Sequence, residues 1–192
     1  MDDFDFSDWR QGPLQLIWPT QNNPAEILEF NTYSEWRRFV DGFGLRSAPP
    51  RIVASKFQRA QRIYLLAWLD FDIVKAGELA ALVALELALQ NQYGGEARKL
   101  RPKPKVIKPE GPGSLGLQIL LKYMIEHDGL TAAALPSLRR PGRDLLERIV
   151  GTGRPNLVDI RNGLAHGDPF GGGYQAGLIE LVRDLIDYAY RN

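Results

Sequence analysis

Three polar residues close together in the sequence, Arg161, Asn162 and His166, have side chains that could act together on a phosphate group. If the segment is helical, Asn162 and His166 share a face because they are four residues apart, and Arg161 lies at the edge of that face. Arginine binds phosphate oxygens through paired N–H donors and stays charged, whereas histidine exchanges protons near neutral pH. Phosphodiester transfer without a metal requires these two roles, a base for the attacking 2′-hydroxyl and a cation for the charge that develops on the phosphoryl oxygens.

The element that must position these side chains is a helix predicted over residues 156–166, ending at Gly167. Ile160 and Leu164 are also four residues apart and would fill the opposite, core-facing side of this helix. The pattern therefore predicts a guanidinium, an amide and an imidazole gathered at one helix end.

The composition limits what else the chain can do. Its 192 residues are 44% hydrophobic and 24% charged, which is ordinary for a soluble globular chain. It has no cysteine and only two histidines, His127 and His166, so thiolate chemistry and cysteine-based or histidine-rich metal sites are excluded, and we expect no metal and no cofactor. The net charge of +1 means that nucleic-acid binding needs a local basic patch. The acidic start and the short apolar runs predict a cytoplasmic protein that does not enter a membrane.

The chain divides into an N-terminal extension, residues 1–50, and a helical domain, residues 51–192. The extension has an acidic, aromatic start, two short apolar segments at 14–18 and 27–30 that read as strands, and a capping box at Thr32 and Glu35 that begins a helix. The next 51 residues, from Arg51 to Arg101, hold no proline and predict one long helix, or two separated near 71–77, ending at Gly94–Gly95. Further helices are predicted over 115–126, 131–138, 144–150, 156–166 and 176–190. The predicted fold class is all-α, with a short irregular or partly β extension.

Glu86 is the single carboxylate in the otherwise apolar segment 79–89, so it must find a partner, because burying an unpaired charge is costly. It could bridge to Arg161 and support the guanidinium. It could equally form a structural bridge to another arginine such as Arg148 or Arg154. The sequence leaves both interpretations open.

A basic, proline-rich strip could follow an RNA backbone, although it has no aromatic side chains for base stacking and could be plain solvated surface. Its residues are Arg98, Lys99, Arg101, Lys103 and Lys105, and Arg139, Arg140 and Arg143 could add to it.

Two other features indicate structure rather than chemistry. The string GPGSLG at 111–116 lacks the preceding strand of a dinucleotide site, and His127 is expected to lie at a helix C-terminus.

The string RNGLAHG, residues 161–167, resembles the Arg-x4–6-His motif of the HEPN superfamily, and the segment 80–90 is similar to an earlier helix of these proteins. The resemblance implies an all-helical bundle that forms a homodimer with two facing motifs. Many members are metal-independent endoribonucleases of toxin–antitoxin and antiviral defence systems, and others only bind nucleotides or RNA. Under this resemblance, Arg161 would stabilise the transition state, His166 would act as general base or acid, and Asn162 would orient His166 or the phosphate.

The resemblance predicts an endoribonuclease that leaves 2′,3′-cyclic phosphate ends, with RNA as substrate and an antitoxin or defence-complex protein as a further partner. Some family toxins have a tyrosine two residues after the histidine, the site that their antitoxins modify. Asp168 stands there in this chain, which argues against that route. The alternatives are a non-catalytic module that binds nucleotide, RNA or a protein, and a purely structural helix end in which Arg161 pairs with Glu86.

Overall fold

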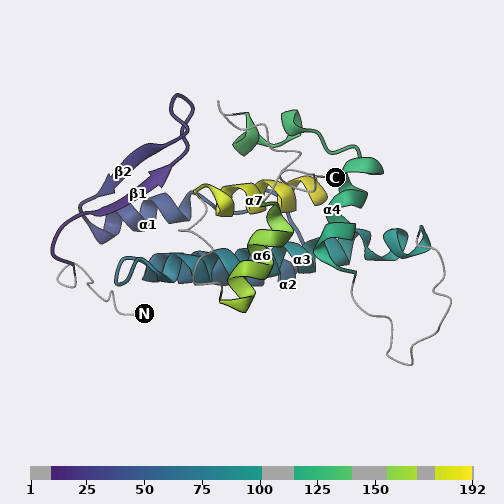
Figure 1. Ribbon diagram of the computed structural model, residues 1–192, viewed down its shortest axis with the longest axis horizontal. Helices are drawn as coiled ribbons and strands as arrows, with labels where there is room; N and C mark the ends of the chain where they lie inside the picture. Colours follow the sequence, from purple (N-terminus) through teal and green to yellow (C-terminus); the bar gives the residue numbers. More distant parts are fainter. Residues whose placement is uncertain (1–9, 101–114, 140–154, 168–175, 192) are drawn as a thin grey trace.

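The computed structural model describes residues 10–100, 115–139, 155–167 and 176–191, and these residues are mostly helical (Figure 1). A two-stranded antiparallel sheet, β1 (Leu14–Trp18) and β2 (Glu26–Phe30), precedes the helices. The described helices are α1 (Tyr33–Asp41), α2 (Arg51–Leu66), α3 (Ile73–Lys99), α4 (Leu117–Glu126), α6 (Leu157–His166) and α7 (Leu178–Ala189). The mainly helical fold with a short β segment at its start is therefore confirmed. None of these described helices is long and apolar enough to cross a membrane.

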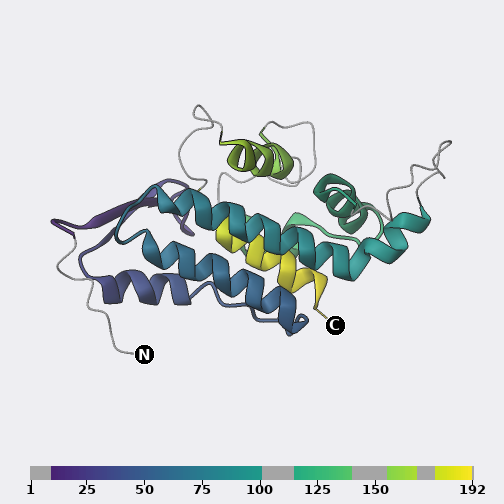
Figure 2. The same ribbon diagram turned by 90° about the horizontal axis from the view of Figure 1, so that it is seen from below.

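Helix α3 is the centre of the arrangement, because α2, α4, α6 and α7 all contact it. Figure 2 shows α1, α2 and α3 side by side with α7 behind them, and α6 on the side of α3 away from α2. The core between the helices is fully buried and rich in large side chains, among them Trp36, Phe57, Tyr64, Trp68, Leu82, Leu85, Leu89, Leu120, Leu121 and Met124.

The β hairpin packs its alternate residues into the same core as the helices. In β1, Leu14, Leu16 and Trp18 are buried, whereas the residues between them are exposed. The indole ring of Trp18 stacks on Phe43 with ring centroids 5.4 Å apart, and its Nε1 donates a hydrogen bond to Oε2 of Glu180 in α7 at 3.1 Å. The period-two burial explains why these five residues form a strand rather than a helical turn.

Several local predictions can be compared with the structure. The capping box is confirmed, since the Glu35 amide donates to Oγ1 of Thr32 at 3.2 Å and the Glu35 carboxylate accepts from the Thr32 amide. The proline-free stretch is two helices, α2 and α3, separated by residues 67–72. The short helical piece predicted over 131–138 consists of two 3₁₀ turns, Ala132–Ala134 and Pro136–Leu138, because Pro136 prevents one continuous α-helix. The predicted helix over 144–150 lies outside the described residues.

The predicted helix end at Gly94–Gly95 is wrong, because α3 continues to Lys99. Each glycine costs a helix up to about 1 kcal/mol. Packing offsets this cost, since Tyr93 and Ala97 on either side of the pair are both buried. Tertiary contacts therefore decide the length of α3 against the local preference.

Close contact between α2 and α3 depends on Gly77. A Cβ built at this position would lie 2.8 Å from Cε2 of Tyr64, a fully buried ring that cannot move aside. We expect Gly77→Ala to lower the free energy of unfolding by about 1–3 kcal/mol through overpacking. The measurement is urea denaturation followed by circular dichroism.

Gly95→Ala in the same helix is the matched control, because a Cβ there meets no atom within 4 Å. It should raise stability by up to about 1 kcal/mol through helix propensity alone. Equal effects at the two positions would show that the α2–α3 contact is looser than described.

Candidate functional site

Helix α6 is defined by strong signals at both ends. Asn156 is its N-cap, and its side chain accepts hydrogen bonds from the amides of Val158 and Asp159 at 2.9 and 3.0 Å. The carboxylate of Asp159 accepts in return from the Asn156 amide. At the other end Gly167 has a left-handed φ of 65°, which only glycine adopts at low cost, so the helix ends at His166 as predicted.

The guanidinium of Arg161 is held between two helices. Its Nη2 lies 3.3 Å from Oε2 of Glu86 in α3, and its Nη1 donates to Oδ1 of Asn162 at 3.3 Å. The side chains of Arg161 and Glu86 are 33% and 23% exposed, so the pair lies at the surface rather than in the core. Because a guanidinium has five N–H donors, this arrangement leaves donors for a ligand from solvent.

Of the two interpretations of Glu86, the bridge to Arg161 is present among the described residues. The rival partners Arg148 and Arg154 lie outside the described residues. The pair joins α6 to α3, and Figure 1 shows α6 lying across α3.

His166 is the last residue of α6, and it is exposed to solvent. No hydrogen bond connects its imidazole to Arg161 or Asn162 in the described part of the chain. On the opposite side of α6, Ile160 and Leu164 pack against the core but are only partly buried. The structure therefore brings Arg161 into contact with both Asn162 and Glu86, and it places His166 on the same short helix as Arg161 and Asn162.

The basic strip is described only in part. Arg98 and Lys99 are exposed in the last turn of α3, and Nζ of Lys99 lies 2.6 Å from Oε1 of Glu96. Arg139 donates to the carbonyl oxygen of Ala133 at 2.8 Å. The other members, Arg101, Lys103, Lys105, Arg140 and Arg143, lie outside the described residues, as does most of the GPGSLG string.

His127, the second histidine, is exposed at the C-cap of α4, which confirms the predicted helix-end position. Its ring lies 5.0 Å from that of Tyr123.

Beside His127 is a polar cluster that the sequence did not indicate. Asp128 accepts hydrogen bonds of 2.7 Å from both Tyr93 of α3 and Arg191, which follows α7.

Electrostatics in this cluster tie three helices together. Burial raises the pKa of Tyr93, and the adjacent Asp128 carboxylate raises it further. Burial alone would raise the pKa of Asp128, but hydrogen bonds from Arg191 and Tyr93 outweigh it and hold this pKa below its ordinary value. A lowered carboxyl pKa stabilises the fold above the unfolded pKa, and this contribution is lost as the pH falls through the folded pKa. The cluster of Tyr93, Asp128 and Arg191 therefore stabilises the packing of the helices.

No group of three or more His, Asp or Glu side chains that could hold a metal ion occurs among the described residues. Comparison of the chain with protein-family models, with curated proteins and with solved structures found no match. The assignment of function therefore depends on the chemistry of the α6 site and on the resemblance of its motif.

Proposed function

We propose that the protein is a metal-independent endoribonuclease of the HEPN type, with Arg161, Asn162 and His166 as its catalytic residues. The observation that carries the proposal is the Arg161 guanidinium, which Glu86 and Asn162 hold at the surface while His166 stands exposed at the end of the same helix. A fixed cation and an accessible imidazole are the two groups that phosphodiester transfer needs.

In the proposed reaction the 2′-oxygen of a ribose attacks the adjacent phosphorus, and the bond from phosphorus to the 5′-oxygen breaks. The His166 imidazole accepts the proton of the 2′-hydroxyl, and the leaving 5′-oxygen takes a proton from water. The products are a 2′,3′-cyclic phosphate and a 5′-hydroxyl end, and the imidazolium then returns its proton to solvent. Arg161 stabilises the extra negative charge on the phosphoryl oxygens, and Glu86 acts as a positioning residue for that guanidinium.

The resemblance to the HEPN superfamily supports the remaining parts of the proposal. These are a homodimer in which two motifs face one another, and a role as a toxin or defence effector with an antitoxin or defence-complex protein as partner. A non-catalytic module that binds RNA, nucleotide or protein at the same residues is the alternative, and the experiment below separates the two.

The test is incubation of the purified full-length chain with mixed single-stranded RNA in EDTA, followed by analysis of the new ends. The proposal expects cleavage without added metal, with 2′,3′-cyclic phosphate and 5′-hydroxyl ends. The matched control is the same RNA with 2′-O-methyl groups, which should remain intact because it lacks the attacking hydroxyl. Cleavage of the methylated strand, or no cleavage of either strand, would overturn the proposal, and binding without cleavage would favour the non-catalytic module.

A further inference from the structure

The solvent face of α2 has a concentration of positive charge. This helix contains four basic residues, Arg51, Lys56, Arg59 and Arg62, and no acidic residue. The rest of the chain contains the other 20 of the 24 basic residues and all 23 acidic residues, so acidic residues outnumber basic ones outside α2. The net positive charge of the chain is therefore located on this one helix.

The arginines of α2 form a line. Arg51, Ser55, Arg59 and Arg62 are four, four and three residues apart, so they follow one ridge of the helix. All four are exposed. At a rise of about 1.5 Å per residue, the ridge is about 16 Å long.

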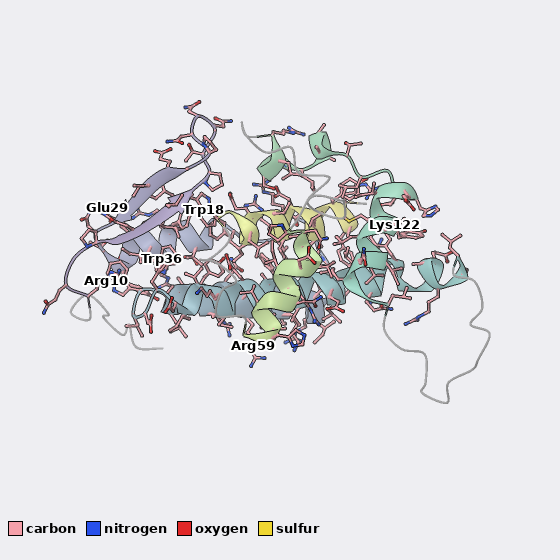
Figure 3. The ribbon with its side chains drawn as sticks, in the orientation of Figure 1. Arg10, Trp18, Glu29, Trp36, Arg59 and Lys122 are labelled. Atoms are coloured by element: carbon pink, nitrogen blue, oxygen red, sulfur yellow. The ribbon has the colours of Figure 1, made fainter. Side chains whose placement is uncertain are left out.

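No ion pair neutralises these arginines in the described part of the chain, where the salt bridges lie on other elements. The acidic residues of the neighbouring α1 are engaged within that helix, since Glu35 caps it and Asp41 lies 3.7 Å from Arg37. Figure 2 shows α2 lying between α1 and α3, and Figure 3 shows Arg59 at the lower edge of the molecule, pointing away from it. The charges are therefore free to meet an external anion.

From this geometry we propose that the α2 ridge binds the phosphodiester backbone of single-stranded RNA, outside the Arg161–His166 site. Three guanidiniums in a row match a chain of phosphates, because each can grip phosphate oxygens with paired donors. A sequence-independent contact of this kind places a strand on the protein without reading its bases. The proposal holds whether or not the protein cleaves the strand.

The surroundings of the ridge favour RNA over a membrane or an apolar protein surface. The apolar side of α2, which includes Val53, Phe57 and Tyr64, is buried against the bundle and cannot enter a lipid layer. The exposed apolar residues Ile52 and Leu66 stand near opposite ends of the helix, about 21 Å apart along its axis. No continuous apolar patch is available there as the core of a protein interface.

The test measures binding of a fluorescently labelled 2′-O-methyl RNA, which cannot be cleaved, by anisotropy over a range of salt concentrations. The test variant is Arg51→Gln/Arg59→Gln/Arg62→Gln. A control with the same charge loss is Arg37→Gln/Arg46→Gln/Lys122→Gln, whose exposed cations lie on three other segments; Figure 3 shows Lys122 on α4, well separated from Arg59. Circular dichroism checks that each variant is folded.

Each lost single-strand phosphate contact removes about 0.7 from the slope of log affinity against log salt. We therefore expect a slope shallower by about 2 for the test variant and RNA binding about 100-fold weaker at about 0.1 M salt, with the control close to the parent. If the triple variant does not fold, Arg59→Gln alone should reduce the slope by about 0.7. Equal binding by the test and control variants, no RNA binding by the parent, or binding of the parent to phosphatidylserine vesicles but not to RNA would overturn the proposal.

Discussion

Replacement of His166 by alanine is expected to slow RNA cleavage by about 10²–10⁴-fold, the usual contribution of a general base or acid. The fold should not change, because His166 is exposed at the end of α6 and Gly167 still terminates the helix. The rate is measured under single-turnover conditions in EDTA. Thermal unfolding of the variant should match that of the parent within the error of the measurement.

The chain contains its own control for this substitution, since it has only one other histidine. His127 is likewise exposed and likewise at a helix C-terminus, but on α4. His127→Ala removes the same group in a similar local setting and should leave cleavage unchanged. If both variants cut RNA as fast as the parent, the imidazole at position 166 has no catalytic role, and the mechanism proposed here fails with it.

The bounds of α6 could be predicted because they depend on local signals. A glycine that adopts positive φ ends the helix wherever the rest of the chain lies. The partner of Glu86 was open to two interpretations, and the cost of an unpaired carboxylate required only that a partner exist. The choice of Arg161 depends on how α6 lies across α3, which no local signal encodes.

Other features were missed because their residues are far apart in the sequence. Asp128 draws its partners from 35 and 63 residues away, so no spacing rule indicates them. The basic face of α2 could have been found from the sequence, because four basic and no acidic residues in a 16-residue helix is a visible pattern.

The sequence predicts a buried stripe on the last helix, made of Leu178, Leu181, Val182, Leu185 and Ala189, and the burial of charge in α7 departs from this pattern. The predicted stripe is buried, but Arg183 and Asp184 are buried as well, at 4% and 3% exposure. Oδ1 of Asp184 accepts hydrogen bonds from Nε and Nη2 of Arg183 at 3.0 and 2.7 Å, and Oδ2 accepts from the Ser137 amide at 2.7 Å. This carboxylate therefore connects α7 to the 3₁₀ turn at Pro136–Leu138.

Asp184→Asn is expected to lower the free energy of unfolding by about 3–5 kcal/mol, the usual cost of removing one partner of a buried ion pair. The amide is neutral and has a single acceptor oxygen, so its NH₂ group must face either the guanidinium of Arg183 or the Ser137 amide, which are both donors. The measurement is urea denaturation, in which the midpoint should fall while the slope stays constant.

Two further variants separate the buried charge from simple loss of a contact. Glu126→Gln breaks the exposed ion pair in which Nζ of Lys122 lies 3.5 Å from Oε1 of Glu126. It should lower the free energy of unfolding by no more than about 1 kcal/mol. Arg183→Met combined with Asp184→Asn removes the unpaired guanidinium and should recover part of the loss, because an apolar replacement of a buried pair is often close to neutral. A single Asp184→Asn variant no less stable than Glu126→Gln would mean that water reaches this pair, and that α7 is not enclosed as the structure has it.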